Sequence, residues 1–148
     1  MKTYILILTI LLTSICFGQK IKIKHKDGNK WVKTLSASDI SQAGSDYNTF
    51  YESKTNQTEI DISKNKKNKE IEVKIHKEDL YWNSGLKISA RRSNTGQAYQ
   101  EISNVFPQSF IKTSGDQKIK IQYKIRGLSV LLPVGNYSTE IFYTIMDY

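Results

Sequence analysis

The chain has 148 residues, a formal net charge of +8 and a single cysteine. This length fits one domain of ordinary size, and one thiol excludes a module that is stapled by internal disulfides. Only two histidines are present, roughly fifty residues apart, so the clustered ligands of a zinc site are missing.

The first 18 residues have the layout of a cleavable signal peptide. A positive second residue precedes an apolar run over residues 4–12, and Cys16 and Gly18 are small, as signal peptidase requires. We therefore predict cleavage between Gly18 and Gln19. The expected location is secreted, periplasmic or at the cell surface.

Two alternatives for this segment fit less well. A membrane anchor needs about 18 uninterrupted apolar residues, and the run is shorter and contains hydroxyl residues. A lipid anchor on Cys16 would normally follow a small residue, whereas Ile15 precedes it.

Residues 19–148 are the expected mature domain. Cleavage would remove the cysteine, Lys2 and no acid, which leaves +7 of the formal charge of +8. A domain of this size without disulfides points to a bacterial envelope or extracellular origin.

Lysines are concentrated in two segments, residues 20–33 and 64–77, with six in each. Such an excess indicates affinity for anionic glycans, lipid headgroups or nucleic acid. The alternative, which we favour, is that the lysines cover solvent faces and edges of strands and suppress aggregation. Nucleic acid is the least expected partner, because arginine recognises phosphate better and lysine dominates here.

Strict alternation of apolar and polar residues predicts an all-β fold. The alternating segments are residues 20–26, 56–63, 70–76, 86–90, 117–126 and 137–146. Seven to nine short strands fit an immunoglobulin-like antiparallel β-sandwich, with a closed barrel as the alternative. Asp27-Gly28 predicts a hairpin turn that returns residues 31–35 as a second arm, and residues 38–43 could form one helical turn.

Two features concern the last two strands. Apolar residues occupy odd positions from Ile119 to Ile125 and even positions from Leu128 to Leu132. Because a one-residue slip reverses the faces of a strand, we predict a β-bulge or a switch between sheets at Gly127. Residues 137–146 carry apolar side chains on both faces, which favours a central or covered strand.

Catalytic motifs are absent from the sequence. There is no Gly-x-Ser-x-Gly elbow, the glycines are scattered singly, and no carboxylate spacing fits a calcium loop. We expect no enzyme activity, no metal and no cofactor.

The best candidate ligand surface comprises Tyr81, Arg91, Arg92 and Tyr99. Aromatic planes beside arginines can stack on sugars or grip anionic polymers. The neighbouring Trp82 shares the inward phase of its strand and is expected in the core.

The C-terminal stretch resembles secreted pilin-like domains of the spore coat U group and related archaic chaperone–usher pilins. The resemblance rests on Pro133, Gly135 and Tyr137, a turn that launches a final alternating strand. Those pilins usually carry a cysteine pair, which residues 19–148 lack. Residues 82–96 and the Phe-Gly-Gln end of the signal peptide are similar to uncharacterised secreted proteins of Bacteroidota.

The pilin resemblance implies a polymer in which an N-terminal strand enters the neighbouring subunit. Ile21 and Ile23 are the inward residues of the candidate donor strand. The alternative, which we prefer, is that this strand pairs within its own domain through the Asp27-Gly28 turn.

The sequence therefore favours a non-enzymatic secreted or cell-surface protein with a structural or adhesive role, and the pilin resemblance implies a pilus-like subunit. The expected partners are other copies of the chain or other surface proteins. The alternatives are a module that binds a glycan or anionic polymer and a periplasmic inhibitor or chaperone-like accessory.

Overall fold

The computed structural model describes residues 20–65 and 69–147. The predicted signal peptide and its cleavage site lie outside the described residues. The elements in chain order are β1 (Lys20–His25), a 3-10 turn (Ala37–Asp39), β2 (Phe50–Glu52), β3 (Thr58–Ser63), β4 (Glu70–Tyr81), β5 (Lys87–Arg92), β6 (Gln100–Glu101), β7 (Gln108–Ser114), β8 (Gln117–Arg126) and β9 (Ser138–Asp147).

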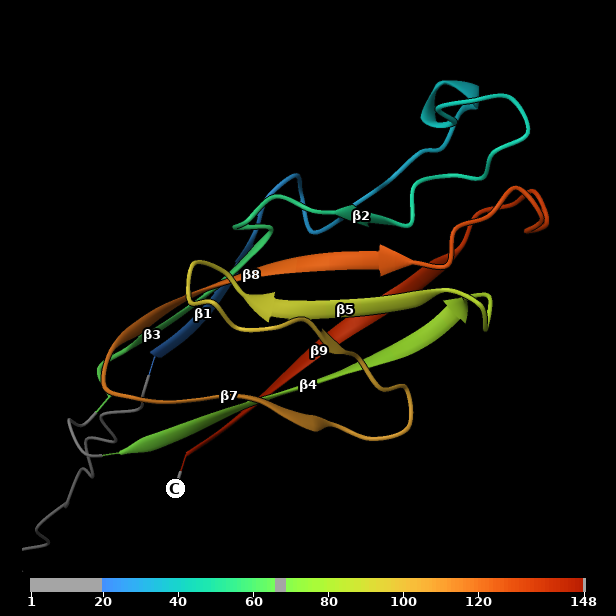
Figure 1. Ribbon diagram of the computed structural model, residues 1–148. Coiled ribbons are helices and arrows are strands. Elements are labelled where there is room, and N and C mark those ends of the chain that lie inside the picture. The colour runs from blue at the N-terminus through green and yellow to red at the C-terminus, as the bar shows by residue number, and fades with distance from the viewer. Residues whose placement is uncertain (1–19, 66–68, 148) are drawn as a thin grey trace, which may run out of the picture.

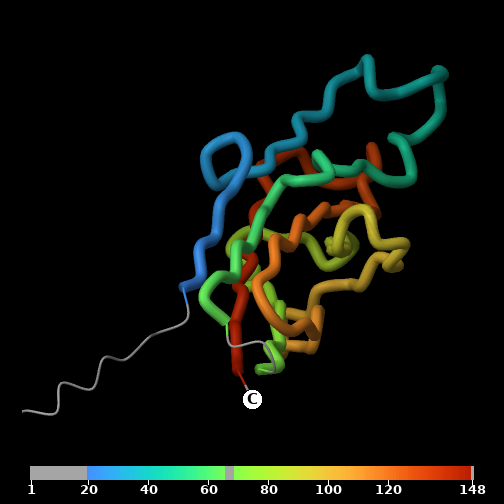
Figure 2. Tube along the Cα trace, turned by 90° about the vertical axis from the view of Figure 1, so that its left-hand side faces the viewer, coloured from blue at the N-terminus to red at the C-terminus, as the bar shows by residue number. Residues whose placement is uncertain are grey.

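The strands form two antiparallel sheets that pack as a β-sandwich (Figure 1). One sheet has the order β1-β3-β8-β5-β6, with β2 also paired to β8, and the other has the order β7-β4-β9. The β1–β2 connection stands out from the sandwich (Figure 2). The predicted all-β sandwich is confirmed.

Alternation decides which side chains enter the core, because successive residues of a strand point to opposite faces. The buried hydrophobic residues of the two sheets are Ile60, Ile62, Ile71, Val73, Ile75, Ile88, Ala90, Ile102, Phe110, Ile111, Ile119, Ile121 and Tyr123. Trp31 and Trp82 are half-buried and pack against this cluster. The prediction that Trp82 lies in the core is thus only partly confirmed.

Hydroxyl groups join the two sheets through the core. The Tyr123 hydroxyl lies 2.7 Å from Thr58 Oγ1 and 2.6 Å from the Tyr143 hydroxyl. Thr58 and Tyr123 belong to the larger sheet and Tyr143 to the smaller one. This chain of hydrogen bonds satisfies polar groups that would otherwise be costly to bury.

The hairpin expected after β1 is not formed. β1 pairs with β3, from Lys20 opposite Ser63 to His25 opposite Thr58, and residues 31–35 contain no strand. The Asp27-Gly28 turn is formed, and its two flanking carbonyls, those of Lys26 and Lys30, accept hydrogen bonds from the Gln57 side chain. These bonds tie the turn to the end of β3, and Trp31 then stacks on Tyr123.

The helical turn is also displaced from its expected position. The 3-10 turn spans Ala37–Asp39 and is capped by the preceding Ser36, whose backbone N–H donates to the Asp39 carboxylate. The prediction placed the turn over residues 38–43. Ser36 takes the capping role because its side chain and the Asp39 side chain form a capping box.

Gly127 terminates β8 and is neither a bulge nor a point where a strand continues into the other sheet. β8 ends at Arg126, and the chain crosses to β9 through residues 127–137 as a loop. Gly127 has φ +84°, and an added Cβ would lie 2.1 Å from the Gly85 carbonyl oxygen. Only glycine fits this close approach of two loops.

β9 is an edge strand and not the expected central one, because it pairs with β4 alone. Its outward Phe142 stacks on His76 with ring centroids 5.1 Å apart and remains 37% exposed. Apolar residues on both faces of the strand therefore reflect a local aromatic pair and not a central position.

Candidate functional site

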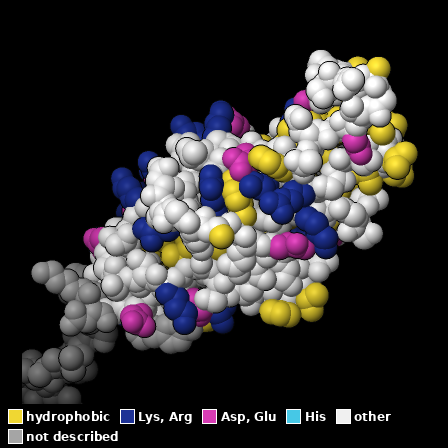
Figure 3. Space-filling view, viewed as in Figure 1, with side chains coloured by type: hydrophobic (Ala, Val, Ile, Leu, Met, Phe, Trp, Pro, Cys, Tyr) yellow, Lys and Arg dark blue, Asp and Glu magenta, His cyan; other side chains and the backbone are white. Residues whose placement is uncertain are grey.

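The outer face of the larger sheet carries most of the basic excess. The register places nine basic residues on this face, Lys20, Lys22, Lys24, Lys87, Arg91, Lys118, Lys120, Lys124 and Arg126. It places four acids there, Glu52, Glu59, Asp61 and Glu101. Figure 3 shows Lys and Arg side chains spread over the region of β1, β3, β8 and β5. We call this surface the basic face.

The outer face of the smaller sheet has the opposite balance. Here the outward residues of β4, β7 and β9 include two lysines and four acids. They are Lys74 and Lys112 against Glu70, Glu72, Glu78 and Glu140. Glu72 is only 5% exposed and lies 3.8 Å from Lys74 Nζ, so the exposed charges of this face are close to balanced. The basic face is therefore the preferred side for an anionic partner.

Arg91 and Tyr99 come together on the basic face, as the candidate surface required. The Arg91 Cζ atom lies 4.5 Å from the centroid of the Tyr99 ring. The Arg91 guanidinium also donates to Gln122 Oε1, at 2.9 Å from Nη2. Tyr99 is therefore held against the sheet by a cation–π contact.

Lys124 and Glu52, which the sequence analysis did not single out, complete this cluster. Lys124 Nζ lies 3.9 Å from the Tyr99 centroid, 4.5 Å from the Phe50 centroid and 3.0 Å from Glu52 Oε1. Their common signal in the sequence is the outward phase of β2 and β8. That signal becomes informative only once the pairing of the strands is known.

Two pKa shifts follow from this packing. Burial and the negative charge of Glu52 raise the pKa of Tyr99 to about 12. Burial also acts to raise the pKa of Glu52, but the hydrogen bond and positive charge of Lys124 outweigh it, so this pKa is lowered. The cluster thus holds an ionised carboxylate and a neutral phenol at neutral pH.

Arg92 and Tyr81 lie elsewhere. Arg92 is on the inner face of β5, where its guanidinium donates to Gln117 Oε1 at 3.3 Å and its backbone N–H donates to Gln97. Tyr81 ends β4 in the smaller sheet and is 76% exposed. The predicted four-residue surface is therefore reduced to Arg91 and Tyr99.

The candidate donor residues Ile21 and Ile23 lie on β1, opposite Ile62 and Ile60 of the same chain. They face inward but remain 38% and 42% exposed. The smaller sheet has only three strands and does not cover them. β1 is consequently attached mainly by backbone pairing.

Within residues 20–65 and 69–147, no group of three or more His, Cys, Asp or Glu could hold a metal ion. No helix in the same ranges is long and apolar enough to cross a membrane.

Across the part of the chain that the structure describes, the fold and these surfaces define a nine-stranded antiparallel β-sandwich with one basic face. No protein-family description, curated protein or solved structure matches this chain.

Proposed function

We propose that the protein is a non-enzymatic adhesive β-sandwich of the cell surface or extracellular space that binds an anionic polysaccharide on its basic face. The observation that carries this proposal is the excess of nine basic over four acidic residues on that face. The signal peptide predicted for residues 1–18 supports the location.

The spacing of the charges suits an extended polymer. Outward residues of one strand lie about 7 Å apart, and the screening length at physiological salt is about 8 Å. Neighbouring charges such as Lys118 and Lys120 therefore act together on a bound chain. The acids Glu59 and Asp61 each lie between lysines of β1 and β8 and offset only part of this charge.

A polysaccharide fits the basic face better than single-stranded nucleic acid does. Proteins that bind single strands stack bases on free aromatic rings. Here Lys124 lies over the rings of both Tyr99 and Phe50, and Arg91 lies over Tyr99. The aromatic surface is thus occupied by the protein's own cations, which leaves charge as the main recognition element.

The proposal is tested with residues 19–148 and three immobilised probes, dextran sulfate, uncharged dextran and single-stranded DNA. We expect retention on dextran sulfate that falls as salt rises, and none on dextran. The double variant Lys118→Gln/Lys120→Gln should weaken binding roughly two- to thirtyfold at low salt, since each exposed charge contributes about 0.2–1 kcal/mol.

A matched control removes the same charge from other places. Lys64→Gln/Lys112→Gln also deletes two positive charges, one in the β3–β4 loop and one on the outer face of the smaller sheet. Equal weakening by both pairs would show that net charge alone acts and would overturn the assignment to the basic face. Preference for DNA over dextran sulfate would overturn the choice of polymer.

A pilus-like subunit is the second candidate function, favoured by the incomplete cover of Ile21 and Ile23. A strand attached mainly by its backbone can pair with the same partner in another copy. The 24-residue connection between β1 and β2 would allow such an exchange.

A cysteine pair distinguishes exchange from internal pairing. Lys24 lies directly opposite Glu59, and residues opposite each other in antiparallel strands are close enough for a disulfide. In Lys24→Cys/Glu59→Cys protein, exchange predicts a disulfide-linked ladder on a non-reducing gel. A disulfide-linked monomer at all protein concentrations would argue against the pilus-like role.

A further inference from the structure

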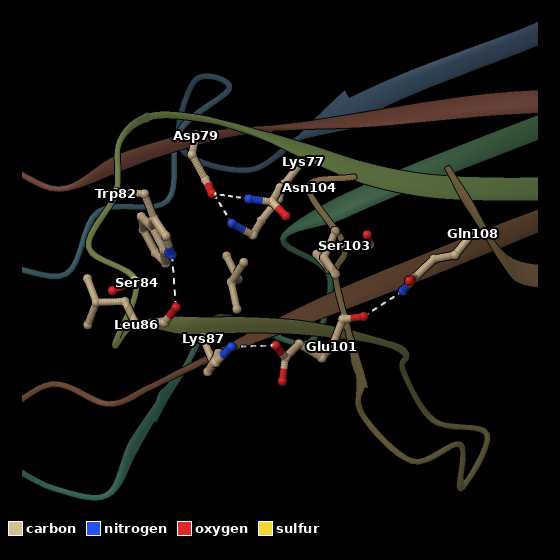
Figure 4. A pocket seen from close by; sticks show the side chains of 12 residues that line it. Lys77, Asp79, Trp82, Ser84, Leu86, Lys87, Glu101, Ser103, Asn104 and Gln108 are labelled. Atoms are coloured by element: carbon tan, nitrogen blue, oxygen red, sulfur yellow. Dashed lines mark hydrogen bonds and ion pairs between the residues drawn. The ribbon is translucent and has the colours of Figure 1, made fainter. Parts of the chain in front are cut away.

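A cavity of about 460 Å³ lies between the two sheets at the end where β4 leads into β5. Its apolar base is formed by Leu86, Ile88 and Ile102, all buried. Polar side chains from β4, β6 and the β6–β7 loop surround this base (Figure 4). An apolar base with a few converging polar groups is the usual composition of a small-ligand site.

The cavity lies where the inward residues of β4 change from apolar to charged. Ile71, Val73 and Ile75 point into the core, and the next two residues in the same phase are Lys77 and Asp79. Lys77 is only 7% exposed. Charged residues at core positions break the local pattern, and such breaks are expected at functional or strained positions.

The polar side chains are held in place by one another. The Asp79 carboxylate accepts hydrogen bonds from Lys77 Nζ and, at 2.9 Å, from Asn104 Nδ2. The Lys77 backbone N–H donates to the Ser103 carbonyl at 2.9 Å, which fixes the β6–β7 loop against β4. A carboxylate, an ammonium and an amide thus converge as acceptor and donors for a polar ligand.

Trp82 supplies a flat apolar wall. Its indole N–H donates to the Leu86 carbonyl at 2.9 Å, which sets the orientation of the ring. Figure 4 shows the indole at one end of the hollow, with Lys77, Asp79 and Asn104 along one side. Lys77 Nζ lies 5.5 Å from the centroid of this ring and covers part of it. A ligand would therefore contact the part of the ring that Lys77 leaves free, with its polar edge toward Lys77 and Asp79.

The charges of the cavity cancel in pairs. Lys77 is paired with Asp79, and Lys87 is paired with Glu101 at 3.2 Å. A ligand with a net charge would gain little from these balanced pairs. The cavity instead suits an uncharged molecule with one apolar face and several hydroxyl groups.

We propose that this cavity binds one uncharged pyranose ring, which packs against Trp82 and exchanges hydrogen bonds with Asp79, Lys77 and Asn104. The cavity shares Lys87 and Glu101 with the basic face, but Trp82, Lys77, Asp79 and Asn104 lie outside that face. The ligand and the variants of this site therefore differ from those of the proposed function. A sugar that binds here could be a neutral unit of a larger glycan or a free glycoside.

The test follows the side-chain N–H signals of ¹⁵N-labelled protein (residues 19–148) by NMR. The probes are the methyl glycosides of glucose, galactose, mannose and N-acetylglucosamine. The two tryptophans give two indole signals, which Trp31→Phe assigns. We expect at least one glycoside to shift the Trp82 and Asn104 signals saturably, while Trp31 stays unmoved.

Asn104→Ala should lower the affinity for that glycoside at least fivefold. Trp82→Phe should also lower this affinity, and the amide spectrum of the variant should show that it is still folded. Asn136→Ala, an exposed loop asparagine, is the matched control and should bind as the unaltered protein does. Saturation by none of the four glycosides, or binding unchanged in Asn104→Ala, overturns the proposal. Equal shifts with glycerol would also overturn it, because the ring would then not be recognised.

Discussion

Among single residues, Gly127 is required for a reason other than the one that its neighbours in the sequence indicate. The change of apolar phase around it predicted a bulge or a switch between sheets, but β8 simply ends there. The reason for glycine is the close approach of the Gly85 carbonyl together with a φ of +84°. Neither cause is visible in a local pattern.

Gly127→Ala should lower the free energy of unfolding by roughly 2–5 kcal/mol, since it adds left-handed strain to a clash with backbone. Gly135→Ala is the control, because Gly135 has no neighbour within 4 Å of an added Cβ and its φ lies outside the positive range. Urea denaturation of both variants checks the difference. Equal stability of the two variants would contradict the packing of Gly127 against Gly85.

At the scale of elements, the chain of hydroxyls from Thr58 through Tyr123 to Tyr143 links β3 and β8 to β9. Burial raises the pKa of Tyr123, and it raises that of Tyr143 further, so both phenols stay neutral at physiological pH. Tyr123 is the central member, with a partner on each side. Its loss leaves the Tyr143 hydroxyl without its partner, whereas Thr58 Oγ1 still lies 3.1 Å from His25 Nδ1.

Tyr123→Phe should therefore destabilise the fold by roughly 1–3 kcal/mol, the cost of leaving buried polar groups unpaired. Tyr143→Phe should cost less, because Tyr123 keeps its bond to Thr58. The measurement is the midpoint of thermal unfolding for the two variants. A larger loss from Tyr143→Phe would contradict this order.

At the scale of the whole molecule, acid should destabilise the protein. The carboxyl pKa values of Asp39, Asp46, Glu52, Asp79 and Asp147 are lowered in the folded state. A lowered folded pKa contributes stability above the unfolded pKa, near 4, and this contribution is lost as pH falls through the folded pKa. Protonation of acids also increases the positive charge of a basic protein.

We expect the free energy of unfolding to be nearly constant from pH 5 to 8 and to fall below about pH 4.5. Burial opposes ionisation of Asp79, but its bonds from Lys77, Thr139 and Asn104 outweigh that effect. Asp79→Asn should accordingly flatten part of the acid limb relative to the unaltered protein. Chemical denaturation of both proteins across this pH range checks the difference, and an equally steep limb in Asp79→Asn would refute the assignment.

Much of the fold was predictable because alternation is a local property. The inward residues of β3, β4, β5 and β8 follow from period two, and most of them form the core. Partner choice is not local, since an alternating strand pairs equally well with several others. This is why β1 was expected beside residues 31–35 and lies beside β3.

The candidate surface, like the fold, could be predicted from the sequence only in part. Arg91 and Tyr99 can be grouped from residue type and spacing. Arg92 continues the inward phase of β5, which the alternation already indicates, and its partner Gln117 becomes known only from the structure. Lys124 and Glu52 were missed because their contact depends on the pairing of β2 with β8. Side chains far apart in sequence meet only after the register is set.

The alternation of side chains in the sequence is enough to predict strands with one apolar face each, and it favours a sandwich while leaving a closed barrel as the alternative. It also placed lysines on the outward phase of β1 and β8. Only the tertiary structure decided that these lysines share one face, that β9 lies at an edge, and that Lys77 and Asp79 meet Trp82 and Asn104 around a cavity. The physical reason is that pairing and sheet packing are chosen by the burial of the whole core, which no single segment contains.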